Sequence, residues 1–463
     1  MHYLVVALAF IFILGSAVVL HEFGHFIVAK LFRIRVETFS VGFGPRLFGR
    51  KWGDTDYRVS AIPLGGYVKL GGDESNAPIE GAGDQNIPPE QMFNLRPRWQ
   101  RVLVALAGPV MNVLTALAIP FAAAMMYGVP VAPAPVVYDM QRGGAAEKAG
   151  LQPGDRIVAF NGKRNPSWDA INEDTLLGPG RAMPMVVQRN GQEIPLTFVP
   201  SSHVENGDVA GTLDFTPDYG GLPVIVSGVD AGSPAAETGL QDGDRLLSIA
   251  DQPVKSSVQV IEYIRNHDAQ RIPISVQRNG QTVQLTTPER RIDGSRLGFG
   301  VKEQFPVEKA TIGSAIAYAY DTNLQILRLT GKALGQVFTG NRSVRNTLSG
   351  PIGIYQAAQS SVERLGWGGV FGMLGFLSLN LGIFNLLPIP VLDGGAIFLL
   401  LLEGLLGLGG LTLSTAVRDR IQQVGFVMVL LLMVFVITND VIKTFGGGGS
   451  RQQEKPPATA PAK

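Results

Sequence analysis

The chain has no cysteine among its 463 residues. Disulfide bonds, thiol catalysis and cysteine-ligated metal sites are therefore excluded. Histidine is scarce, with five residues, so a transition-metal site has to combine imidazoles with Asp or Glu. Neither sign of charge dominates, because 39 basic residues stand against 38 acidic ones. Proteins that bind nucleic acid through its phosphates usually carry a basic excess, so we expect no nucleic-acid partner.

Long apolar stretches raise the mean hydropathy of the chain to +0.19. A helix that spans a bilayer needs about 20 mostly apolar residues. The apolar stretches predict a polytopic α-helical membrane protein with four transmembrane helices, at residues 1–29, 102–127, 365–393 and 424–442. A cleaved signal peptide is the alternative for the first stretch. We treat that stretch as retained, because no Lys or Arg precedes it and it continues past the small residues 15–17.

Basic residues indicate how the chain crosses the membrane. Clusters without acidic residues flank the connection between the first two spans, and they consist of Lys30, Arg33, Arg35, Arg96, Arg98 and Arg101. The positive-inside rule places this loop, residues 30–101, in the cytoplasm. Residues 128–364 then lie on the outer side, and residues 394–423 form a second cytoplasmic connection.

The outer segment contains an internal repeat. Residues 149–157 recur at 238–246, and residues 188–192 recur at 277–281, both with an offset of 89 residues. Short β-branched stretches, an Asn-Gly turn and a helical stretch in each copy predict two tandem α+β domains, residues 128–220 and 221–308.

The G-L-x-x-G-D pattern in each copy resembles PDZ domains, which bind extended peptides along a sheet edge. A role as a spacer or size filter is the alternative to peptide binding. The sequence does not decide between these two roles, because the stretches before the first strands, residues 129–135 and 220–223, match a carboxylate-binding loop poorly.

Two segments complete the outline of the chain. Residues 309–364 predict an amphipathic surface segment that packs on the membrane or on the domain pair, with a helical stripe of Ile312, Ile316, Tyr320, Leu324 and Leu327. Residues 443–463 contain four glycines and a serine followed by a Pro-rich stretch. They predict a flexible tail, either a natural linker or an added one, that is not part of the fold.

A candidate metal-binding and catalytic motif follows the first apolar run and reads His21-Glu22-Phe23-Gly24-His25. In H-E-x-x-H on a helix, the two imidazoles share one face and can reach one zinc ion. Glu22 can take a proton from water and return it to the leaving amine. A lone His in a membrane helix is often a packing residue, but two His and one Glu together at membrane depth are costly without a shared partner.

A catalytic zinc ion takes three protein ligands and one water. Asp393 is the leading candidate for the third ligand, because the ends of the first and third spans both face the cytoplasm in the predicted threading. His2 lies at the wrong end of its helix, and His203 and His267 lie in the outer domains. Taken alone, Asp393 would fit an interfacial carboxylate at a helix end. Asn112 and Asn380 are polar at bilayer depth and either line a hydrated cavity or bond neighbouring helices.

H-E-F-G-H on the first span, together with N-x-x-P-x-P-x-L-D-G at residues 385–394, resembles the site-2 protease family of intramembrane zinc metalloproteases. The paired PDZ-like repeats between spans two and three narrow this resemblance to members from Gram-negative bacteria. The resemblance extends to residue 445 and includes residues 42–45, 66–70, 107–112 and 349–354. Ala396 departs from it, since relatives often have His after L-D-G-G.

The resemblance implies that His21, His25 and Asp393 bind Zn²⁺, that Glu22 is the catalytic acid and base, and that Asn385 helps to hold the substrate backbone. It also implies a membrane-associated β element within residues 30–101. The strand of that element that presents substrate would consist of Gly66, Tyr67, Val68, Lys69 and Leu70. A plain cytoplasmic hairpin domain is the alternative for this region.

The resemblance further implies a location in the bacterial inner membrane, with the PDZ-like domains in the periplasm and the active site near the cytoplasmic side. The implied substrates are transmembrane segments of single-span proteins: anti-sigma factors already trimmed by a first protease in the envelope stress response, and leftover signal peptides. The two rival function classes are a non-catalytic PDZ membrane scaffold, which leaves H-E-x-x-H unexplained, and a metal transporter, which leaves Glu22 unexplained.

Overall fold

The computed structural model describes residues 2–73, 86–205, 208–230, 232–267, 270–289, 291–292, 297–339, 343–347, 349–408 and 414–445. Within this part of the chain, four helices are long and apolar enough to cross a membrane, which confirms the predicted number of spans. They are α1 (His2–Leu31), α3 (Arg98–Tyr127), α10 (Pro351–Asn385) and α12 (Thr415–Phe445). Most of the predicted flexible tail, residues 446–463, lies outside the described residues.

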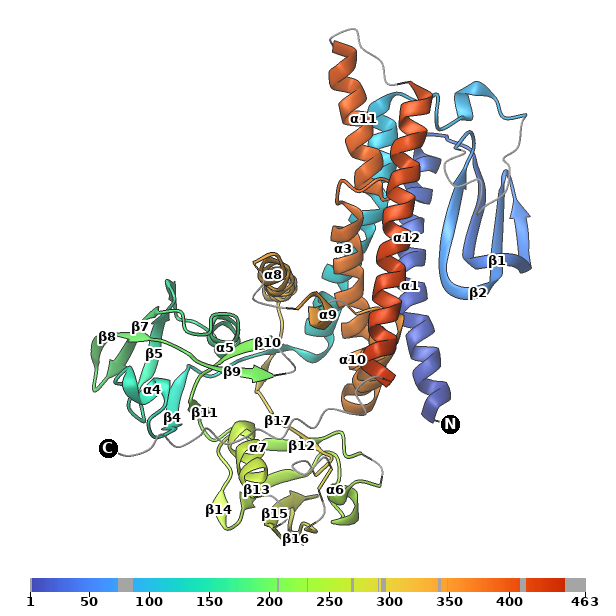
Figure 1. The fold of residues 1–463 in the computed structure, drawn as a ribbon. Coiled ribbons are helices and arrows are strands. Elements are labelled where there is room, and N and C mark those ends of the chain that lie inside the picture. Colours follow the sequence, from blue (N-terminus) through green and yellow to red (C-terminus); the bar gives the residue numbers. More distant parts are fainter. Residues whose placement is uncertain are drawn as a thin grey trace.

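The four long helices lie side by side (Figure 1), with β1, β2 and α11 toward one end and the sheets of the outer segment toward the other. Small residues let them approach closely: Ala9 and Ala17 of α1 are buried with Ala358 of α10. Lipid provides no hydrophobic drive between helices, so such van der Waals contact holds them together. Helix α12 packs least, with 6% of its span buried.

A long, curled hairpin of β1 (Val36–Trp52) and β2 (Thr55–Leu70) lies beside α1. Residues 36–41 pair with residues 66–70 on one side and, from Thr38 on, with residues 56–59 on the other. Gly42 (φ 93°) and Gly65 (φ 157°) lie where the hairpin folds over, in conformations that side chains disfavour. The folding leaves residues 66–70 as an edge that faces α1, where Gly66 approaches Val19.

The repeat of the outer segment forms two sheet domains with the same strand order. The first sheet domain has the order β11-β4-β5-β7-β8, with β6 paired to β5. Its elements are β4 (Val136–Met140), α4 (Ala145–Lys148), β5 (Arg156–Phe160), β6 (Lys163–Arg164), α5 (Trp168–Leu176), β7 (Met183–Arg189), β8 (Gln192–Phe198) and β11 (Phe215–Asp218).

The second sheet domain has the order β17-β12-β13-β15-β16, with β14 paired to β13. Its elements are β12 (Val224–Ser227), α6 (Pro234–Glu237), β13 (Arg245–Ile249), β14 (Gln252–Pro253), α7 (Ser257–Asn266), β15 (Pro273–Arg278), β16 (Gln281–Thr286) and β17 (Gly300–Glu303). Each domain has its own apolar core. The equivalent strand orders explain the 89-residue offset, which relates Arg156 at the start of β5 to Arg245 at the start of β13.

One ion pair accounts for both repeated motifs. In the first sheet domain, Arg189 donates to both carboxylate oxygens of Asp155, at 2.7 and 2.6 Å. In the second, Arg278 does the same to Asp244, at 2.7 Å for both oxygens. Asp155 and Asp244 are 0% and 1% exposed. The Asp of the G-D motif and the Arg of the Q-R-N-G motif therefore recur together because a buried carboxylate needs a bidentate partner.

Short elements join these parts. The strands β3 (Val129–Pro130) and β18 (Val307–Glu308) pair across the ends of the outer segment, and β9 (Ser201–Glu205) pairs with β10 (Asp208–Thr212). The remaining short helices are η1 (Pro89–Gln91) and α9 (Val344–Thr347).

Residues 309–364 form α8 (Ile312–Phe338), α9 and the start of α10. The capping box of Thr311 and Ser314 begins α8. Ala315, Ala319 and Asn323 are buried, and Asn323 donates to the carbonyl of Ala116 on α3 at 3.0 Å. The predicted apolar stripe lies on the other side, where Ile312, Ile316 and Tyr320 are exposed.

The structure differs from the expected boundaries around the third span. Helix α10 starts earlier, changes direction at Gly366 (φ 57°) and ends at Asn385 rather than near residue 393. Pro388 and Pro390 interrupt the helix because proline lacks the backbone N–H. Asp393 begins a further helix, α11 (Asp393–Leu408), within the segment expected to be a cytoplasmic connection. Asp393 is therefore not the last residue of span three but the first residue of α11.

Candidate metal centre

Helix α1 supplies two imidazoles from adjacent turns. His21 and His25 lie on the same helix face, and their Nε2 atoms are 3.2 Å apart. Gly24 lies between them in sequence, and a side chain there would collide with the carbonyl of Ala107 on α3. The H-E-x-G-H sequence therefore places two metal-binding side chains on a helix that also packs tightly against α3.

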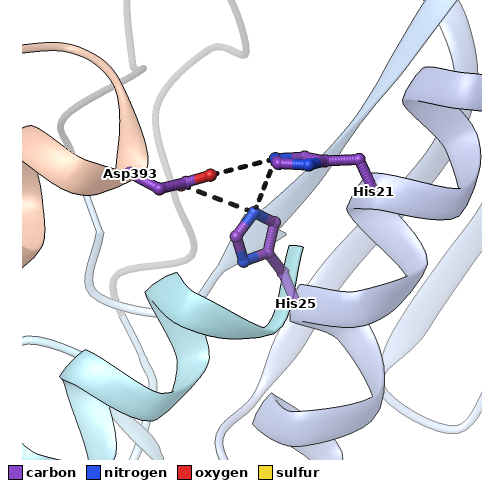
Figure 2. A group of neighbouring side chains, drawn as sticks. All are labelled: His21, His25 and Asp393. Atoms are coloured by element: carbon purple, nitrogen blue, oxygen red, sulfur yellow. Dashed lines mark hydrogen bonds and ion pairs between the residues drawn. The ribbon is translucent and has the colours of Figure 1, made fainter. Parts of the chain in front are cut away.

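The break between α10 and α11 brings a carboxylate to the same point. Oδ2 of Asp393 lies 3.0 Å from Nε2 of His21, and Oδ1 lies 3.5 Å from Nε2 of His25. Figure 2 shows the three side chains pointing toward one another from α1 and α11. Val391 has a φ of 86°, a conformation rare for a β-branched residue, directly before this turn into α11. The irregular backbone of residues 386–392 thus delivers Asp393 to the imidazoles.

The spacing of these three side chains fits a zinc ion. Ligand atoms around a tetrahedral zinc, at bond lengths of about 2.1 Å, stand about 3.4 Å from one another. The two Nε2 atoms are 3.2 Å apart, and each faces one oxygen of the Asp393 carboxylate, at 3.0 Å for Oδ2 and 3.5 Å for Oδ1. With one ligand atom taken from each residue, the three atoms lie within 4.8 Å of one another. In addition, Oδ2 of Asp393 is buried and receives no hydrogen bond from the described residues. A buried carboxylate oxygen facing two imidazole nitrogens suits a cation at their centre.

Helix α3 contacts the far side of both imidazoles. Nδ1 of His25 lies 2.7 Å from the carbonyl oxygen of Val104, so this nitrogen carries a proton and Nε2 is left with its lone pair. Nδ1 of His21 lies 3.1 Å from the amide of Asn112. Gly108 lies on α3 between Val104 and Asn112. A Cβ atom at Gly108 would collide with the rings of His21 and His25.

Glu22, the neighbour of His21 on α1, contacts the hairpin. Its Oε2 accepts a hydrogen bond from the backbone N–H of Val68 at 3.1 Å. Asn385, the last residue of α10, places its Nδ2 3.2 Å from Nε2 of His21. The structure therefore brings the predicted residues Glu22, Asn385 and Val68 into contact with one another or with the ligand cluster.

The other residues of the predicted substrate strand lie along the same edge. Tyr67 stacks on Phe43, and its hydroxyl accepts a hydrogen bond from Arg58. Lys69 is 7% exposed and lies 3.6 Å from the carboxylate of Glu37. Within this strand, Val68 reaches Glu22 through its backbone N–H.

The residue patterns do not point to Val104 or Gly108 as site residues, and they fit Asn112 either with a hydrated cavity or with a bond between helices. Residues 107–112 belong to the segments that resemble the family, and this resemblance could have indicated Gly108 and Asn112. The contact of Val104 could not be read from residue type, because it uses a backbone carbonyl.

A model of Peptidase family M50 matches residues 9–432. The chain is 34% identical to the regulator of sigma-E protease RseP of Salmonella typhimurium, over 93% of this chain and 97% of that protein. It is 32% identical to the protein of the same name from Escherichia coli, over 93% and 97% of the two chains. Among solved structures, the PDZ domain of an SdrC-like protein from Listeria monocytogenes matches 17% of this chain and 85% of that chain, at 26% identity and a TM-score of 0.16. The chain belongs to peptidase family M50 and is a membrane-embedded zinc metalloprotease of the site-2 type.

Proposed function

We propose that His21, His25 and Asp393 hold the zinc ion and that Glu22 transfers protons during hydrolysis of a peptide bond within a transmembrane segment. The observation that carries this proposal is the convergence of three ligand atoms from α1 and α11. When bound, zinc supplies a Lewis acid that polarises a carbonyl and lowers the pKa of water. The chain supplies the metal ligands, the carboxylate that transfers protons and the groups that bind the substrate backbone.

The proton carrier is positioned from two sides. Glu22 is fixed to α1 next to His21, and the N–H of Val68 holds its Oε2. A carboxylate oriented in this way takes a proton from the attacking water and returns it to the leaving amine. A contact from the hairpin to the catalytic carboxylate also links the strand that receives substrate to the group that acts on it.

The edge of residues 66–70 is suited to an unwound substrate. A transmembrane helix satisfies its own backbone groups, and its unwound amides need new partners in a dry medium. An edge strand offers unpaired N–H and C=O groups that can add one more strand. Exposed apolar side chains of the hairpin, Leu47, Phe48, Trp52, Ile62 and Leu64, suit insertion into lipid, which supports a membrane-associated β element over a plain cytoplasmic hairpin. Asn385, at the end of α10, would hold the substrate backbone next to His21.

The chain is an integral inner-membrane protein, and we propose that the metal centre lies near its cytoplasmic side. The basic residues Lys30, Arg33, Arg96, Arg98 and Arg101 gather at the ends of α1 and α3 that adjoin the hairpin. Positive charge concentrates in cytoplasmic loops. The two sheet domains lie toward the other end of the bundle (Figure 1), and this supports our proposal that they are periplasmic.

The relatives carry the name regulator of sigma-E protease. For this chain we propose single-span anti-sigma factors, already trimmed outside the membrane, and leftover signal peptides as substrates. Such substrates lack a bulky outer domain, and the paired sheet domains would exclude proteins that retain one.

Peptide binding by the sheet domains is supported by the order of their strands. In the order of each sheet, β11 and β17 are terminal strands. Residues 129–135 and 220–223, which match a carboxylate-binding loop poorly, precede the interior strands β4 and β12 instead. In the second sheet domain, Gly298 and Phe299 directly precede the terminal strand β17. We therefore propose that a peptide binds alongside β17 rather than beside the interior strand β12.

A Glu22→Gln variant tests the catalytic assignment. We expect cleavage of a model transmembrane peptide to fall by about 10²- to 10⁴-fold, the usual range for a proton-transfer group, while zinc content stays at the wild-type level. Glu308→Gln, on the exposed strand β18, is the control with the same change of charge and should cleave normally. A scaffold or a metal transporter would function unchanged in Glu22→Gln, and cleavage at the wild-type rate would overturn the assignment.

A further inference from the structure

Asn112 lies at the centre of a buried polar network that joins three membrane-spanning helices. Its side chain on α3 is 0% exposed, and so is that of Ser378 on α10. The Asn112 amide contacts Nδ1 of His21 on α1 at 3.1 Å and Oγ of Ser378 at 3.2 Å. The Ser378 hydroxyl also donates to the backbone oxygen of Asn112 at 3.0 Å.

The chemistry of imidazole restricts what Asn112 can do. A neutral imidazole has one N–H and one nitrogen lone pair. Nε2 of His21 faces Asp393 and His25, so metal binding requires the lone pair at Nε2 and the proton at Nδ1. The group that faces Nδ1 must then accept a hydrogen bond, and this partner determines which nitrogen of the ring is free.

The Asn112 amide can turn either its nitrogen or its oxygen toward His21. If the amide nitrogen faces His21, it donates to Nδ1, so the imidazole proton must sit on Nε2. The single hydroxyl hydrogen of Ser378 then faces two oxygens of Asn112, the amide oxygen and the backbone oxygen. With the oxygen there, every donor has one acceptor. Nδ1–H of His21 donates to Oδ1 of Asn112, Nδ2–H of Asn112 donates to Oγ of Ser378, and the Ser378 hydroxyl donates to the backbone oxygen of Asn112. Complete pairing favours this second arrangement, because a buried polar group without a partner is costly.

We propose that Asn112 is a positioning residue of the metal centre: its amide oxygen, oriented by Ser378, accepts the Nδ1 proton of His21 and leaves the Nε2 lone pair for zinc. This inference rests on the proposed zinc site. His25 receives the matching support from the carbonyl oxygen of Val104 at 2.7 Å. Helix α3 therefore supplies the acceptor for both imidazoles, from positions one turn before and one turn after Gly108.

Zinc affinity, measured by competition with a chelator on the purified full-length protein in detergent, tests this role without using activity. Asn112→Leu keeps the shape but removes the acceptor, and we expect zinc to bind about 10- to 100-fold more weakly, as for other residues that orient a metal-binding His. Asn112→Asp keeps an acceptor oxygen and should bind zinc within a few-fold of wild type. Ser378→Ala, which removes only a hydroxyl, should weaken binding in the same direction but less.

Asn380→Leu is the matched control, because Asn380 is also a buried Asn (8% exposed) but bonds Phe376 and Thr330 instead of a ligand. Its zinc affinity should equal that of wild type. A purely structural role predicts that Asn112→Leu lowers the melting temperature of the chelator-treated protein more than Asn380→Leu does, with zinc affinity unchanged. That result, or equal losses in Asn112→Leu and Asn112→Asp, would overturn the proposal. If wild type itself bound no zinc, or if His21→Ala bound it normally, the metal centre would be refuted together with this inference.

Discussion

A side-chain carbon at Gly108 would lie 2.7 Å from Nε2 of His21 and closer still to Nε2 of His25. Helix α3 thus passes the two imidazoles at a position that only glycine can occupy without displacing them. The same helix contacts both rings from behind, through Val104 and Asn112. The metal centre therefore depends on α3 even though α3 contributes no ligand.

Gly108→Ala should weaken zinc binding. The added methyl group forces the imidazoles off their positions, and overpacking of a filled site costs about 1–3 kcal/mol, or about 5- to 150-fold in affinity. Chelator competition on the purified protein measures this loss. Gly372→Ala on α10 is the control, because beyond its own stretch of helix no atom of the described residues lies within 4 Å of the added carbon. Equal zinc affinity in the two variants would show that the helices shift apart freely.

Asp393→Ala should remove zinc from the protein. Two imidazoles without the carboxylate leave a catalytic zinc site one protein ligand short, and Asp393 is the ligand that lies on a different helix from the other two. Metal analysis of the purified variant checks this. Asp393→Asn keeps the shape and should also lose most of the metal, since it removes the negative charge. Zinc at the wild-type content in Asp393→Ala would exclude Asp393 from the site.

Val68→Pro should slow catalysis, whereas Val68→Ala should leave it nearly intact. Proline removes the N–H that holds Glu22, and this N–H points away from the hairpin's own pairing, where an edge strand tolerates proline. Loss of a hydrogen bond to a charged group costs about 1.5–3 kcal/mol, or about 10- to 150-fold in rate. We expect the effect in kcat at saturating peptide substrate. Equal rates in the two variants would mean that the side chain, and not the N–H, matters.

Arg278→Met should destabilise the second sheet domain. The change leaves Asp244 buried without its bidentate partner, which costs about 3 kcal/mol. Hydrogen exchange of the amides of β13 and β15 in the full-length protein measures the free energy of opening. Arg271→Met in the same domain is the control, because the Arg271–Glu289 pair is exposed on both sides and such pairs contribute little. Similar protection in the two variants would contradict the assigned role of the buried pair.

The same pair should make the domain sensitive to acid. Burial raises the pKa of Asp244, but hydrogen bonds from Arg278 and from the Gln241 amide, with the charge of Arg278, lower it further, so the pKa lies below its ordinary value. A carboxyl with a lowered pKa stabilises the fold fully above its unfolded pKa of about 4. This contribution disappears as the pH falls through the lower folded value. The difference in protection between wild type and Arg278→Met should therefore shrink below about pH 4, and a difference that grows there would refute the assignment.

Lys332→Met should loosen the first sheet domain from α8. Nζ of Lys332 lies 2.7 Å from Oε1 of Glu173 and 2.7 Å from Oδ1 of Asp174, both on α5 and both buried. Without the ammonium group, two neighbouring carboxylates lose a shared donor, at a cost of about 1–3 kcal/mol. Hydrogen exchange at α5 should be faster in Lys332→Met than in the control variant Lys309→Met. Lys309 is exposed and lies just before α8. Unchanged exchange at α5 would show that the domain is held by other contacts.

Several features followed from residue patterns because their causes are local. Spans are recognisable from apolar length, two imidazoles four residues apart share a helix face, and a domain present twice repeats its Asp and its Arg at one offset. The boundaries near residue 393 were harder to place. An apolar run with Pro388 and Pro390 is compatible with a helix that ends late or with one that stops and restarts, and contacts with other helices select between the two.

The sequence by itself determined the membrane spans, the duplicated domains and the two histidines with their glutamate, since helical spacing and hydropathy act over a few neighbouring residues. Only the tertiary structure decided that Asp393 turns toward those histidines from the start of α11, that α3 supports them through Val104, Gly108 and Asn112, and that Val68 reaches Glu22. These contacts join residues that are 46 to 91 positions apart, or more in the case of Asp393. Contacts of that kind depend on how whole helices pack and where their backbones break, which no local pattern encodes.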